Sequence, residues 1–139
     1  MSMKPITVTA SATLSRHIHS RTTVNLSAAV GLTITLPASV GNGDEYEVFV
    51  LTTVTSNAYV IAVANSTDVI QGGVALSTDI GGTNMLAAAA SDTISMNGST
   101  TGGIRGSWVK VKDVSAGFWK LEGFLVTTGT EATPFSAAV

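Results

Sequence analysis

The chain contains no cysteine, which excludes a disulfide framework and a thiolate metal site. Charged residues are also scarce, at 12% of the 139 residues, about half of the usual ~25%. Because charged side chains keep soluble proteins apart, this scarcity suggests that part of the surface meets protein instead of water. No stretch approaches the roughly 18 apolar residues of a membrane span, and the first residues lack a continuous apolar signal segment. We expect a protein made in a cytoplasm, with no membrane partner.

A strong charge of either sign is missing too, since the net charge is −2 and the pI is near 5.5. Proteins that bind nucleic acid usually carry a basic field, so we expect no nucleic-acid partner. The few charges are unevenly distributed, because Lys4, Arg16 and Arg21 all precede the first acid, Asp44. The sequence therefore has a weakly basic leading segment and an acidic body.

What the chain does have is Ser, Thr, Gly and Asn mixed with Val and Ile, which favours half-buried strands joined by tight turns. Residues 32–36 alternate between aliphatic side chains and threonine, as a strand with one buried face does. The runs 46–51 and 58–64 are expected to form an antiparallel hairpin. The apolar run 85–90 is interpreted as a buried strand or a single turn. Gly-Gly and Asn-Gly breaks separate the shorter runs, which is typical of a sandwich or barrel.

The last third contains a second expected hairpin, in which 108–112 and 118–126 flank a turn at 115–117. Each of these runs holds a tryptophan, Trp108 or Trp119, and we predict that both anchor the core. The tail 127–139 is predicted to be an edge strand or an extended arm.

These patterns together predict an all-β fold: a single compact antiparallel β-sandwich or barrel-like domain with an extended N-terminal arm. The domain is expected to span 21–139. The arm, 1–20, contains the alternation of Ile6 and Val8 with threonines, which suits the addition of a strand to the sheet edge of a neighbour.

Residues that could carry chemistry are few. On a strand, His17 and His19 would share one face, and three such pairs around a three-fold axis could hold an octahedral metal. We prefer to interpret them as ordinary polar residues. Asp44, Glu45 and Glu47 could supply a carboxylate pair, but adjacent acids at a strand entrance are usually solvated. No nucleophile elbow and no phosphate loop occurs. We therefore expect no enzyme, no catalytic residue, no cofactor and no metal site.

Several motifs resemble the head-decoration or head-fibre proteins of tailed bacteriophages. The resemblance covers the chain from about Arg21 to its end and is carried by Ile34-Thr35-Leu36-Pro37, Asp68-Val69-Ile70-Gln71-Gly72, Asp92-Thr93-Ile94-Ser95-Met96-Asn97-Gly98-Ser99, Gly117-Phe118-Trp119 and Thr130-Glu131-Ala132-Thr133-Pro134-Phe135.

This resemblance implies a β-rich subunit, commonly trimeric, that lies on the outer surface of the virion capsid and cements the shell. Its partners would be copies of itself, as a homotrimer, and the major capsid protein of the phage head. A phage fibre or spike domain that binds a host receptor or glycan is the alternative. For the capsid contact we expect the basic and strand-forming residues of the leading segment: Lys4, Ile6, Val8, Arg16 and Arg21.

Overall fold

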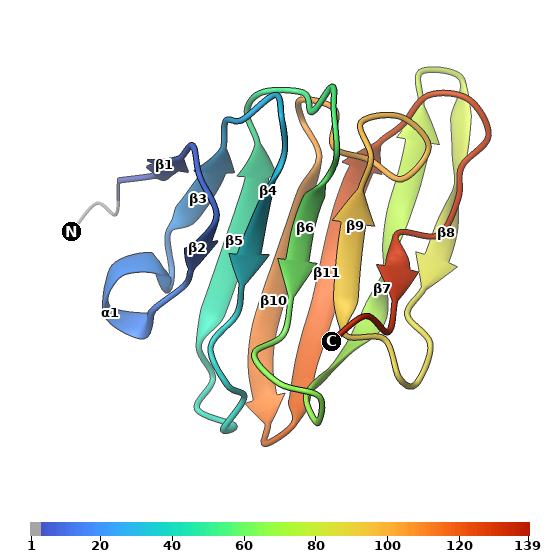
Figure 1. Cartoon of the computed structure of the whole chain (residues 1–139). Coiled ribbons are helices and arrows are strands. Elements are labelled where there is room, and N and C mark those ends of the chain that lie inside the picture. The colour runs from blue at the N-terminus through green and yellow to red at the C-terminus, as the bar shows by residue number, and fades with distance from the viewer. Residues whose placement is uncertain (1–3) are drawn as a thin grey trace.

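The computed structural model describes residues 4–139, and this part of the chain is almost entirely β-structure (Figure 1). The one helix, α1 (Arg16–His19), is a single turn. The strands in chain order are β1 (Ile6–Val8), β2 (Ala12–Thr13), β3 (Thr23–Leu26), β4 (Leu32–Thr35), β5 (Glu45–Val50), β6 (Tyr59–Ala62), β7 (Val69–Thr78), β8 (Gly81–Leu86), β9 (Thr93–Met96), β10 (Trp108–Ser115), β11 (Phe118–Val126) and β12 (Phe135–Ser136).

The strands form two sheets that pack face to face as a sandwich (Figure 1). The larger sheet has seven strands in the order β1-β3-β5-β10-β11-β7-β8, and the smaller has five in the order β12-β9-β6-β4-β2. The predicted all-β sandwich is therefore confirmed. Its inner faces carry the alternating aliphatic residues, because alternate side chains of a strand point to opposite faces of the sheet.

The first six strands alternate between the two sheets, so the chain coils around the core. Strands β1, β3 and β5 lie side by side in the larger sheet, and β2, β4 and β6 in the smaller. When the chain comes back to a sheet, the new strand runs in the same direction as the previous strand of that sheet. The two strands pair in parallel, as β1 does with β3, β3 with β5, β2 with β4 and β4 with β6. The expectation of a purely antiparallel sandwich is thus wrong. The expected hairpin of 46–51 with 58–64 is also wrong, since these runs lie in opposite sheets as β5 and β6.

The second half of the chain contains the predicted final hairpin. Strands β10 and β11 pair antiparallel, with Val111 opposite Leu121, which confirms that prediction. The hairpin lies in the middle of the larger sheet, where β10 pairs with β5 and β11 pairs in parallel with β7. The hairpin thereby joins β5 and β7, which do not pair with each other, into one sheet.

The core lies between the sheets and includes one of the two tryptophans. Trp119 is 1% exposed and meets the ring of Tyr46 edge to face at 5.9 Å. Trp108 is only half-buried and does not belong to the core. Its prediction as a core anchor is wrong because β10 turns Val109 and Val111 inward, which places Trp108 on the outer face.

The described part of the leading segment, 4–20, closes one side of the sandwich and is not a separate arm. Its strands β1 and β2 pair with β3 and β4 at the edges of the two sheets, and Leu14 is buried in the core. The first three residues of the expected arm, 1–3, lie outside the described residues.

The run 85–90 differs from its expectation as well. Only its first two residues belong to a strand, β8, and most of the run is exposed at the opposite edge of the larger sheet. The tail does form an edge strand, as predicted, because β12 is the first strand of the smaller sheet.

Candidate functional site

The most elaborate polar arrangement of the molecule lies at one end of the sandwich, where the loop 37–44 meets the turn of the β10–β11 hairpin. Asp113, on the inner face of β10, is 1% exposed. Its carboxylate accepts hydrogen bonds from the hydroxyl of Ser39 at 2.8 Å and from the backbone N–H groups of Val40 and Gly41 at 2.9 and 2.8 Å. One buried side chain therefore fixes the loop.

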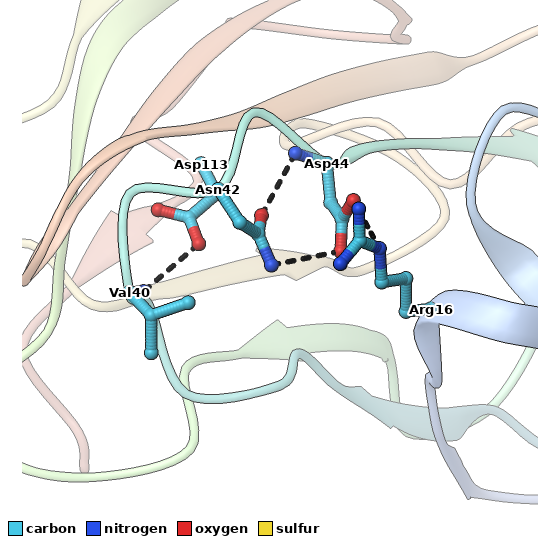
Figure 2. Close-up of polar contacts among 5 residues, drawn as sticks. All are labelled: Arg16, Val40, Asn42, Asp44 and Asp113. Carbon is cyan, nitrogen blue, oxygen red and sulfur yellow. Dashed lines mark hydrogen bonds and ion pairs between the residues drawn. The ribbon is translucent and has the colours of Figure 1, made fainter.

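A second carboxylate fixes the end of the same loop (Figure 2). Asn42 accepts a hydrogen bond from the N–H of Asp44, and its amide donates to the carboxylate of Asp44 at 3.0 Å. The other carboxylate oxygen of Asp44 lies 3.1 Å from Nε of Arg16, on α1. Asp68 contributes from the neighbouring loop, since it accepts the N–H of Ser39 at 2.8 Å. Asp44, expected among the solvated acids, is instead only 8% exposed. Asp68 and Asp113 bind a loop that is distant from them in the chain.

The charge of Asp113 is retained despite burial. Burial alone would raise the pKa of this carboxyl, but the hydrogen bonds from Val40, Ser39 and Gly41 favour the ionised form more strongly, and the pKa lies below its usual value near 3.8. An ionised carboxylate with several donors is a rigid anchor for a loop.

Apolar and cationic side chains are exposed around this fixed loop. Val40 bridges to Ala116 in the hairpin turn and is 64% exposed. On the outer face of the hairpin, Phe118 and Val114 are about half exposed, and they adjoin two lysines that lie directly opposite each other across the strands. We call this surface the hairpin patch. Its members are Val40, Lys112, Val114, Phe118 and Lys120.

An aromatic row crosses the same outer face farther along the strands. Trp108 lies opposite Phe124 on β11 and opposite Phe49 on β5. All three side chains are at least partly exposed. Such cross-strand pairs stabilise a sheet, and a row of them also presents a continuous apolar strip.

The third exposed feature is the edge strand β8, which pairs only with β7. The N–H of Ala87 donates to the carbonyl of Gly72. Because bonding alternates along an antiparallel pair, the backbone groups of Gly82, Asn84 and Leu86 point away from β7. Leu86 is 79% exposed, and β8 contains no charged residue.

The five residues expected to contact a capsid lie on one side of the molecule but are differently engaged. Lys4 and Arg21 are exposed, whereas Arg16 is paired with Asp44. Ile6 and Val8 are half-buried in β1, and Val8 packs against the core of its own subunit.

The two histidines do not share a face, because they lie on the one-turn helix α1 and not on a strand. His17 is exposed, while Nδ1 of the buried His19 accepts the N–H of Ser15 at 2.9 Å. Across residues 4–139, no three His, Asp or Glu side chains are grouped so that they could hold a metal ion. Within the same range, no helix is both long enough and apolar enough to cross a membrane.

Comparison with known proteins gave no match to a family model, to a curated protein or to a solved structure. The functional assignment therefore depends on the surfaces described above and on the motifs of the sequence.

Proposed function

We propose that this chain is a non-enzymatic structural protein that binds the outer surface of a phage capsid as an oligomer and stabilises the shell. Its partners are other copies of itself, as a homotrimer, and the major capsid protein. Binding only the assembled shell stabilises that shell by mass action, and several linked subunits add avidity.

The observation that carries this proposal is the uncovered edge of the larger sheet. Natural proteins protect an edge strand by making it very short or by placing charged residues or proline on it. β1 has three residues and follows Pro5, and β2 and β12 have two residues each. β8 has six residues, no charge and no proline, and it bears the exposed Leu86. Such an edge is suited to a protein partner.

The test is electron microscopy of phage particles assembled with and without this protein. We expect density on the outside of the head that disappears when the protein is missing, and heads without it should break at lower temperature. Density at the tail tip, or none on the particle, would contradict the proposal. Light scattering should give three times 14.1 kDa, and a stable monomer at micromolar concentration would contradict association before binding.

A phage fibre or spike domain that binds a host receptor or glycan is the second candidate, and the aromatic row favours it. An exposed aromatic ring beside polar groups suits sugar recognition. Trp108 is the one tryptophan or tyrosine of the chain that is not buried. If replacing Trp108 with alanine abolished binding to host cells and left thermal stability unchanged, this candidate would replace the first.

A further inference from the structure

We propose that the hairpin patch is the surface with which this chain docks on the shell, and that it receives an apolar contact ringed by carboxylates. This inference rests on the proposed function and deepens it, because it places the docking surface on the hairpin end of the sandwich instead of the leading segment. The argument combines the fixed loop, the exposed apolar side chains and an unfavourable pair of charges.

The first step is the rigidity of the loop that carries Val40. The buried carboxylates of Asp113 and Asp68 accept hydrogen bonds from backbone N–H groups of this loop and from the hydroxyl of Ser39. Burying a charge is costly unless the charge is fully hydrogen-bonded. Any other conformation of the loop would leave these buried carboxylates without donors, so one conformation is favoured. The loop nevertheless turns an apolar side chain outward, with Val40 64% exposed. A preorganised apolar group at a surface lowers the entropy cost of binding.

The second step is the apolar area at the same end of the hairpin, where Val40 pairs with Ala116 of the turn. Phe118 is 50% exposed and Val114 is 49% exposed. On the outer face, both lie between the two lysines and the hairpin turn. Exposed apolar groups that cluster on a rigid element mark protein interaction surfaces more often than isolated ones do.

The third step is charge. Lys112 and Lys120 lie directly opposite each other on β10 and β11, and like charges in this position destabilise a sheet. Nζ of Lys112 is 3.7 Å from Glu45, but that carboxylate is shared with Lys110 at 3.5 Å. Among residues 4–139, Lys120 makes no ion pair. Glu122 lines the same hollow as these lysines, but it lies opposite Lys110, so the row nearest the hairpin turn holds two lysines and one glutamate. A carboxylate from a partner beside Lys120 would remove the repulsion, so the charge of the patch complements an acidic protein surface.

The experiment measures binding to shells that lack this protein, purified from phage particles assembled without it. In Lys120→Glu, the new carboxylate faces Lys112, so we expect a melting temperature equal to or above that of wild type. The same variant should bind shells at least tenfold more weakly. Phe118→Ser removes an exposed ring and is expected to weaken binding to a similar extent while the protein still folds.

Two further variants lie elsewhere on the molecule; the first tests the leading segment and the second is the matched control. Lys4→Glu makes the same charge reversal at the β1 edge, and Val30→Ser removes an exposed apolar side chain from the loop between β3 and β4. Both should bind shells within about twofold of wild type.

The outcomes separate the two proposals. Loss of binding in the patch variants alone supports the inference. If wild type binds and the patch variants bind equally well, the docking surface is elsewhere and the proposed function stands. A loss confined to Lys4→Glu would assign docking to the leading segment. If wild type itself does not bind purified shells, the proposed function and this inference both fail.

Discussion

Two buried tyrosines illustrate how much a single hydroxyl depends on its partners. The hydroxyl of Tyr59 accepts the N–H of Ala28 at 2.9 Å and donates to the carbonyl of Thr52 at 2.6 Å. Among the described residues, the equally buried hydroxyl of Tyr46 has no partner within hydrogen-bond distance, although the carboxylate of Asp44 lies nearby and contributes to its raised pKa. An unpaired buried hydroxyl carries a desolvation cost, whereas a paired one is costly to remove.

The same substitution is therefore expected to have opposite effects at these two positions. Tyr59→Phe should lower the free energy of unfolding by about 1 to 3 kcal/mol, because the N–H of Ala28 loses its acceptor. Tyr46→Phe should leave it unchanged or raise it by up to about 1 kcal/mol. Urea denaturation at pH 7 measures both. Equal losses in the two variants would contradict the difference in hydrogen bonding.

Tyr46 should also affect stability in alkali. Burial, with a further contribution from the charge of Asp44, raises the pKa of Tyr46 from 10.0 to about 12. Between these values the unfolded chain has lost this proton while the native protein keeps it, so stability falls as the pH rises above 10. The decline should be smaller in Tyr46→Phe than in wild type, when each is compared with its own value at pH 8.

At the scale of the element, the edge strand β8 is expected to control self-association. Leu86→Lys places a charge on the exposed edge, which is how natural sheets prevent edge pairing. The variant should fold with a free energy of unfolding within about 0.5 kcal/mol of wild type and should shift the protein toward the monomer. Val30→Lys is the matched control, because it adds the same charge at another exposed apolar position. Unchanged association of Leu86→Lys in light scattering would exclude β8 as the interface.

In the second half of the chain, the sequence predicts the final hairpin correctly but does not predict which side chains are buried. The hairpin was predicted from alternation and a glycine turn, and a register centred on Ala116 would also have placed Lys112 opposite Lys120. Alternation does not say which side faces the other sheet, however, so Trp108 was assigned to the core. Likewise, the apolar run 85–90 predicts a buried strand or a single turn, because composition does not distinguish a central strand from an exposed edge.

The pairing of the first six strands could not be predicted from local patterns. Among them, the runs 46–51 and 58–64 are expected to pair as a hairpin, which is the common arrangement for consecutive strands. Here each strand crosses to the other sheet, and the pairing of β4 with β6 skips the strand between them. The buried positions of Asp68 and Asp113 depend on this topology too, because their carboxylates accept hydrogen bonds from a loop that is far away in sequence.

At the scale of the whole molecule, buried carboxylates make the fold sensitive to acid. Asp92 holds the C-terminal segment by accepting the N–H groups of Ala138 and Val139. Burial opposes the ionisation of Asp92, but these hydrogen bonds outweigh it, and its pKa, like that of Asp113, lies below the usual 3.8. The native state therefore binds fewer protons than the unfolded chain in mild acid.

The sign of this difference predicts a stability that is level from pH 7 to about 5 and falls as the pH drops through about 4. Asp113→Asn should cost about 1.5 to 3 kcal/mol at pH 7, since the charge-assisted hydrogen bonds are weakened, and should make the acid decline shallower. Asp79→Asn, at an exposed turn, is the control and should retain the wild-type slope. Urea denaturation between pH 7 and pH 2.5 measures both, and an unchanged slope in Asp113→Asn would contradict the role of this carboxylate.

The central position of the β10–β11 hairpin also has a consequence for the order of folding. The strands β1, β3 and β5 can assemble as the chain emerges, and β7 and β8 can pair locally, but the larger sheet has no link between these groups until the hairpin joins β5 to β7. Closing that gap brings together strands of high sequence separation, which is the slow kind of step in β-protein folding. Since Trp119 enters the core with this hairpin, its fluorescence should report the last event of folding and not the first.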